Sequence, residues 1–108
     1  KYTDFASAHG IYIYGDSTTP PGGTINITLD GATIKTTSAG IKTSAGIRIE
    51  NFNGQVTINI TKSTIEATNG YAMYFSNCPH VTINYKGTNK ISGTEGKISG
   101  TVTEYTIQ

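Results

Sequence analysis

The sequence has few of the residues that define several common protein classes. It contains one cysteine, Cys78, which excludes a framework of internal disulfides. Charged residues make up 14% of the chain and the formal net charge is +1, so we expect no nucleic-acid partner and no polybasic membrane-surface domain. No apolar run approaches the ~20 residues of a membrane-spanning helix. With 108 residues, the chain is one domain or part of one.

Strong helix formers are scarce too, since the chain has a single leucine, Leu29. In their place stand 15 isoleucines, 3 valines and 19 threonines, whose β-branched side chains favour strands. The 8 asparagines and 13 glycines favour tight corners. The composition therefore predicts an all-β protein.

The chain also repeats itself. Ile25–Thr37 aligns without a gap with Val56–Thr68, an offset of 31 residues, and the apolar positions coincide. The tetrapeptide VTIN at Val56–Asn59 recurs at Val81–Asn84, an offset of 25 residues. Each period carries three short strand-like stretches, of the types GIxI, VTINI and a third centred on Thr-Ile.

Apolar and polar residues alternate within each stretch, so each strand buries only one face. Stacking equivalent strands of successive repeats, ~4.8 Å apart, would bury those faces in one interior column. The sequence therefore predicts a right-handed parallel β-helix, a β-solenoid, of about three coils with three short strands per coil. An antiparallel sandwich with turns at Asp30-Gly31, Asn53-Gly54 and Asn69-Gly70 is the alternative, but it does not explain the recurrence.

This fold divides the chain into a segment at 1–9, coils over 10–96, and a C-terminal strand at 97–108 that begins a further coil or contacts another subunit. The alternation also predicts an inward ladder of apolar residues. Its members are Ile11, Ile13, Ile25, Ile27, Leu29, Ile34, Ile47, Ile49, Val56, Ile58, Ile60, Ile65, Val81, Ile83 and Ile91.

Several phrases of the chain, ITLDGATI, GIRIENF, VTINI and TNKISG, resemble the secreted parallel β-helix modules of Firmicutes. That family comprises carbohydrate-binding domains related to polysaccharide-lyase-like β-helices, and the similarity covers about 25–93. The resemblance implies an extracellular location, whether secreted, on the cell surface or in a biofilm matrix. It also implies weak calcium or sugar binding, although the sequence has no acidic cluster.

We expect neither catalysis nor a cofactor. Arg48 and Glu50 are the only neighbouring base and acid of the kind that β-helix lyases use, and they read as a surface pair. His9 and His80 lack the spacing of metal ligands, and Cys78 reads as a small corner residue. No two acids form a recognisable motif among Asp4, Asp16, Asp30, Glu50, Glu66, Glu95 and Glu104.

Aromatic side chains offer a candidate contact surface. Tyr12 and Tyr14 alternate with the inward isoleucines, so we expect them to face solvent. Met73 and Phe75 are predicted at equivalent outward places, if their neighbours point inward. Exposed residues of this kind bind sugar rings or another subunit.

The ends of a solenoid leave backbone groups unpaired, and neither terminus reads as a capping helix. Either the chain is part of a longer solenoid, or the next molecule covers each end. Candidate assembly residues are Tyr2, Phe5, Val102, Tyr105 and Ile107.

The leading hypothesis is a secreted, non-enzymatic structural subunit that assembles head to tail with copies of itself into an extracellular fibre. The alternative is an extracellular carbohydrate-binding or adhesin module with a polysaccharide partner. Ice binding is a weaker third.

Overall fold

The computed structural model describes residues 9–38 and 44–107. These residues form eleven strands and no helix. The strands are β1 (His9–Tyr14), β2 (Thr24–Asp30), β3 (Thr33–Thr37), β4 (Ser44–Glu50), β5 (Gln55–Thr61), β6 (Thr64–Thr68), β7 (Gly70–Ser76), β8 (His80–Lys86), β9 (Lys90–Gly93), β10 (Gly96–Ser99) and β11 (Thr103–Ile107).

The strands form three sheets in which every pairing is parallel. Sheet A has the order β1-β4-β7-β10, sheet B has β2-β5-β8-β11, and sheet C has β3-β6-β9. The chain visits the sheets in the order A, B, C, so three complete coils are followed by the first two strands of a fourth. The predicted parallel β-helix with three strands per coil is confirmed, and the antiparallel sandwich is excluded.

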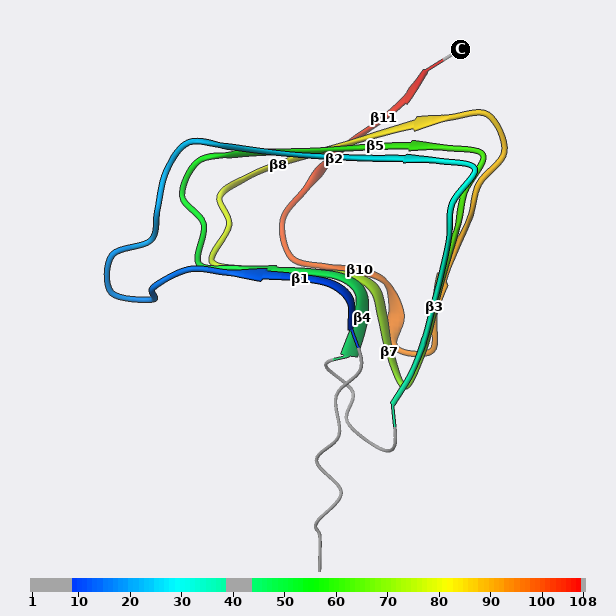
Figure 1. Cartoon of the computed structure of the whole chain (residues 1–108), viewed down its shortest axis with the longest axis horizontal. Coiled ribbons are helices and arrows are strands. Elements are labelled where there is room, and N and C mark those ends of the chain that lie inside the picture. The colour runs from blue at the N-terminus through cyan, green and yellow to red at the C-terminus, as the bar shows by residue number, and fades with distance from the viewer. Residues whose placement is uncertain (1–8, 39–43, 108) are drawn as a thin grey trace, which may run out of the picture.

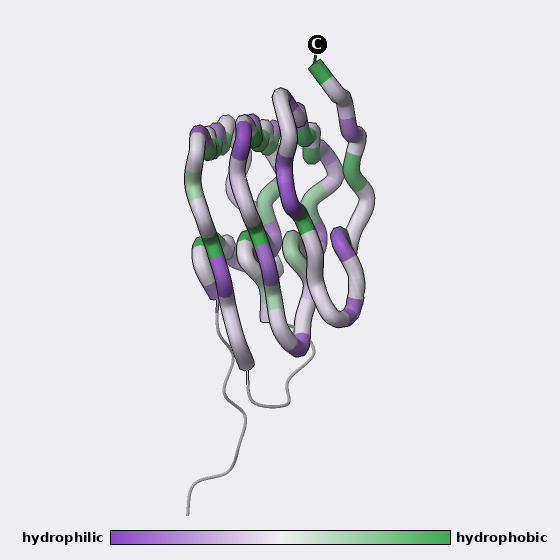
Figure 2. Tube along the Cα trace, turned by 90° about the vertical axis from the view of Figure 1, so that its right-hand side faces the viewer, coloured by the Kyte–Doolittle hydropathy of each residue, from purple (hydrophilic) through white to green (hydrophobic). Residues whose placement is uncertain are grey.

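The winding of the coils is visible in two views. In Figure 1 the chain runs clockwise from β1 through β2 to β3. Figure 2, turned so that the right-hand side of that view faces the reader, shows the coils stacked side by side with the C-terminal coil on the right. The coils therefore recede from the viewer of Figure 1, which makes the solenoid right-handed.

The register of sheet B follows the ungapped sequence alignment. Val56 of β5 lies between Ile25 of β2 and Val81 of β8, and Ile58 lies between Ile27 and Ile83. Stacking a β-branched side chain on its equivalent fills the interior without large voids. All fifteen residues of the predicted ladder belong to the hydrophobic cluster or pack against it.

The expected outward positions of Met73 and Phe75 are wrong. Met73 pairs with Ile47 and Phe75 with Ile49, so both point inward, and they are 0% and 4% exposed. The reason is a register one residue away from the expected one, because Ala72 rather than Tyr71 occupies the place equivalent to Gly46. The residue that faces outward between them is Tyr74, whose phenol can stay hydrated there.

Gly46 is required where sheet A approaches sheet C. A β-carbon at this position would collide with Cγ2 of Ile65 and lie 2.8 Å from the carbonyl oxygen of Ala72. The absence of a side chain therefore lets Ile65 fill the interior at the narrow side of the coil.

The corner between sheets A and B is built by two stacked asparagines. Asn51 and Asn77 have φ of 58° and 55°, in the left-handed region that asparagine tolerates better than most residues. The Asn77 amide donates to Oδ1 of Asn51 at 3.1 Å, and the Asn51 amide donates to the carbonyl of Gly15 at 3.3 Å. This corner therefore repeats from coil to coil and keeps the strands in register.

Candidate functional sites

The N-terminal end of the solenoid exposes part of the apolar interior. We define this end as the outer edges of β1, β2 and β3, which pair with no other strand among the described residues. Inward side chains at this end are only half-buried, whereas their equivalents Ile47, Ile58 and Ile65 in the second coil are 0% exposed. The half-buried residues are Ile11, Ile13, Ile25, Ile27 and Ile34.

The C-terminal end is different because polar residues take over the inward positions. In the pairing of β11 on β8, Glu104 lies opposite Ile83 and Thr106 lies opposite Tyr85. The column Ile27–Ile58–Ile83 therefore ends on a carboxylate, in place of a fourth apolar side chain.

Glu104 has two partners at this end. The Tyr85 hydroxyl donates a short hydrogen bond to its carboxylate, and Nζ of Lys97 lies 3.1 Å from Oε2. Lys97 also lies over the Tyr85 ring, 4.6 Å from its centroid. The hydrogen bond from Tyr85 lowers the pKa of Glu104, aided by Lys97, while burial and the Glu104 carboxylate raise the pKa of Tyr85. The end is thus closed by a satisfied polar cluster.

Beside this cluster, a recess of about 310 Å³ opens above the outer edge of β9. We call it the β9 recess. It is lined by Tyr85, Gly87, Asn89, Ile91, Lys97 and Thr106. Ile91 is the inward residue of β9 and is only half-buried, since no described strand covers it.

The predicted assembly residues fall in three different places. Val102 packs half-buried against the core, between β10 and β11. Tyr105 and Ile107 lie on β11 and are 54% and 46% exposed. Since β11 pairs with β8 of its own chain, it is the second strand of the fourth coil. Tyr2 and Phe5 lie outside the described residues.

A third candidate is the outer surface of sheet A, which we call the tyrosine face and define by Tyr12, Tyr14, Arg48, Glu50 and Tyr74. The register places Tyr12, Arg48 and Tyr74 in one outward column across three coils. Tyr14 lies beside Glu50 in the next column. Tyr12 and Tyr14 are 45% and 69% exposed, and their rings stack at 5.3 Å between centroids.

Arg48 organises the tyrosine face. Its guanidinium carbon lies 5.6 Å from the ring centroid of Tyr12 and 4.3 Å from that of Tyr74, and its Nε pairs with Glu50. The Tyr12 hydroxyl donates to Glu50 at 3.4 Å, and burial together with this carboxylate raises the pKa of Tyr12. Cation–π contacts and the ion pair hold the side chains in place.

Such a surface suits a ligand that offers both flat apolar faces and hydroxyl groups. The exposed rings can stack on the C–H faces of a sugar ring, while the carboxylate and guanidinium can hydrogen-bond hydroxyls. The same surface would also suit the side of another protein subunit.

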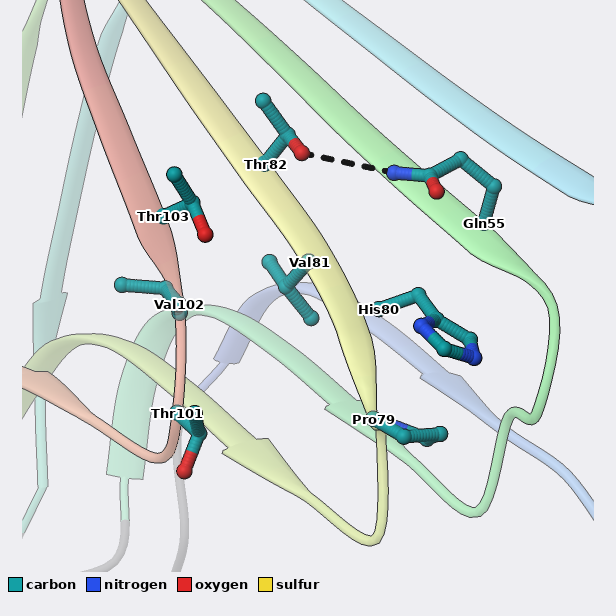
Figure 3. Close-up of a pocket in the computed structure, with 8 residues that line it drawn as sticks. All are labelled: Gln55, Pro79, His80, Val81, Thr82, Thr101, Val102 and Thr103. Carbon is teal, nitrogen blue, oxygen red and sulfur yellow. Dashed lines mark hydrogen bonds between the residues drawn. The ribbon is translucent and has the colours of Figure 1, made fainter.

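A shallower recess of about 180 Å³ lies between the corner that leads into β8 and the corner that leads into β11. Figure 3 shows its lining, in which the Gln55 amide donates to the hydroxyl of Thr82 at 3.4 Å. Threonine and valine side chains dominate it, and His80 lies at its rim. These groups do not converge on one point in the recess.

The remaining sequence candidates are separate from one another. Nδ1 of His9 accepts from the Ala45 amide at 3.3 Å, and its pKa is lowered by burial and by Arg48. Cys78 is buried at a corner, with contacts from Sγ to the carbonyls of Ile49 and Ser76. In the described part of the chain, no three His, Cys, Asp or Glu side chains lie together as metal ligands, and no helix is long and apolar enough to span a membrane.

Sequence reasoning missed Tyr74 and the Glu104–Lys97–Tyr85 cluster. Tyr74 could have been found by treating Ala72 as the counterpart of Gly46, since both are small. Glu104 carries no comparable pattern, because Thr82 to Thr103 spans 21 residues, a shorter coil than those that repeat in sequence.

Comparisons of the chain with known protein families, with curated proteins and with solved structures give no match. The resemblance to secreted β-helix modules therefore stays a prediction.

Proposed function

We propose that this protein is a secreted structural subunit that stacks end to end with copies of itself into an extracellular fibre. The observation that carries the proposal is the half-burial of the first-coil isoleucines beside three unpaired strand edges, when the same columns are fully buried one coil later. A second copy presents the same kind of edge at its C-terminal end, with matching strand direction and sheet order.

The energies are of the right size for such contacts. Completing the burial of one half-exposed isoleucine is worth on the order of 1 kcal/mol, so the five residues together supply about 5 kcal/mol. Association costs about 4–15 kcal/mol in lost freedom. Backbone hydrogen bonds along three strand edges, at about 0.5–1.5 kcal/mol each, therefore decide the balance.

The test is a sedimentation series of the full chain from micromolar to millimolar concentration. We expect polymers above a critical concentration for the native chain and a monomer for Ile27→Lys, whose charged tip would lie in the interface. Thr28→Lys on the same strand is the matched control, because Thr28 faces outward and is exposed. A native chain that stays monodisperse, or an Ile27→Lys variant that assembles as well as Thr28→Lys, would contradict the proposal.

A second function, carbohydrate binding, is favoured by the geometry of the tyrosine face. The stacked pair of Tyr12 and Tyr14 lies on the side of the solenoid, so end-to-end stacking would leave it open. The two functions are therefore compatible, and a fibre would present the face many times along its length.

A glycan array with the native chain tests this second function. Binding should be lost in Tyr14→Ala and kept in Tyr105→Ala, which removes a comparably exposed tyrosine from another sheet. An array without hits, or equal binding by the two variants, would count against it.

A further inference from the structure

The three sheets do not have the same number of strands among the described residues. Sheets A and B each contain four strands and sheet C contains three. The place that lacks a strand is the one above β9, where the β9 recess opens and Ile91 is half-buried.

The order of the coils shows what a neighbouring copy would bring to this place. Every sheet A strand with a described strand before it follows a sheet C strand: β3 precedes β4, β6 precedes β7, and β9 precedes β10. By the same order, the chain that leads into β1 belongs to the sheet C position. In a stack that places β1 of the next copy on β10, this chain lies directly above β9.

The length of that segment fits the place. β1 begins at His9, so residues 1–8 precede it. The corner between sheets C and A takes only Asn69 before β7 and Thr94-Glu95 before β10. Six or seven residues therefore remain for pairing, against the four residues of β9 and the five of β6.

From this juxtaposition we infer that residues 1–8 of one copy dock on the outer edge of β9 of the next copy and fill the β9 recess. This inference rests on the proposed end-to-end stacking and names its joint. With that segment each sheet gains a fourth strand at one end or the other, so both ends have the same helical step. Copies then stack without a gap in any of the three sheets.

The direct test is intermolecular disulfide cross-linking of full-length chains with Cys78 replaced by alanine. One population carries Ser92→Cys, which faces outward at the β9 edge, and the other carries Asp4→Cys, Phe5→Cys or Ala6→Cys in turn. Paired strands bring Cα atoms within disulfide range, about 4.4–6.8 Å. Thr19→Cys, an exposed position on the loop between β1 and β2, replaces Ser92→Cys as the matched control.

We expect at least one of the three positions to cross-link to Ser92→Cys with a yield about tenfold above the Thr19→Cys control. Equal yields at all three positions would overturn the inference. A chain without residues 1–8 gives an independent readout: its critical concentration should rise by about tenfold or more, which corresponds to 1.4 kcal/mol.

These outcomes separate the inference from the proposed function. If the native chain and the shortened chain assemble at the same concentration, the segment has no role in the joint, while end-to-end stacking stands. If the native chain does not assemble, the proposed function fails, and the cross-linking yield still decides whether residues 1–8 dock on β9.

Discussion

Glu104 lies opposite Ile83 in the pairing of β11 on β8, so a carboxylate follows the last isoleucine of an interior column. The first residue of the same column, Ile27, is half-buried at the other end. The two ends of the solenoid therefore differ, with an apolar surface at the N-terminal end and a polar cluster at the C-terminal end.

Replacing this carboxylate should strengthen end-to-end assembly. Glu104→Ile extends the interior column by one side chain, and we expect the critical concentration to fall by about tenfold, for roughly 1.4 kcal/mol of added apolar contact. Glu95→Ile, in the exposed turn before β10, is the matched control. Sedimentation equilibrium measures the change, and equal critical concentrations for the two variants would contradict it.

Truncations of equivalent isoleucines should differ in cost between coils. Ile58→Ala removes a fully buried side chain and should lower the free energy of unfolding by about 2–5 kcal/mol. Ile27→Ala should cost less in the monomer, because its side chain is already half exposed. Urea unfolding of dilute protein measures both values. Equal losses would show that the first coil is covered in solution.

Loss of the space at Gly46 should destabilise the fold without touching either end. Gly46→Ala places a methyl group against Ile65 and the backbone of Ala72. Overpacking of this kind costs about 1–3 kcal/mol. Gly22→Ala is the control, because a β-carbon there would meet no atom within 4 Å. Urea unfolding should separate the two variants, and an unchanged midpoint for Gly46→Ala would contradict the packing described here.

Acid should destabilise the fold in two steps. The pKa of His9 is lowered from 6.5, mainly by burial, so His9 contributes stability above pH 6.5 that is lost as the pH falls through its folded value. The pKa values of Glu66 and Glu104 are lowered from 4.5, mainly by hydrogen bonds from Lys90 and Tyr85, so their contribution is lost as the pH falls below 4.5.

Thermal unfolding between pH 7 and pH 3 checks both steps. The His9→Gln variant should lack the first decline, and Glu104→Gln should have a shallower second decline than the native chain. Identical pH profiles for the native chain and both variants would show that these groups have the same pKa values in the folded and unfolded states.

The interior of the solenoid was predictable because it repeats. Ile25, Val56 and Val81 occupy one column, and the sequence alignment alone places them there. The outward face of β7 was not, because the strand enters with Gly70 and Ala72 at a bend where small residues point inward, and a uniform alternation then assigns Met73 and Phe75 to the wrong side.

The candidate sites depend on register as well as composition. Tyr12 and Tyr14 were identified from β1 alone, but their association with Arg48 and Tyr74 follows from the stacking of three coils. The polar cluster at Glu104 required the pairing of β11, whose sequence repeats no earlier strand.

The most direct test of end-to-end stacking is the axial rise per subunit in a helical reconstruction of the polymers by electron cryomicroscopy. Four coil spacings of about 4.8 Å predict a rise of about 19 Å, with strands perpendicular to the fibre axis and sheets continuous across every joint. Subunits joined through their sides, or native protein that forms no polymer at any concentration, would contradict the account.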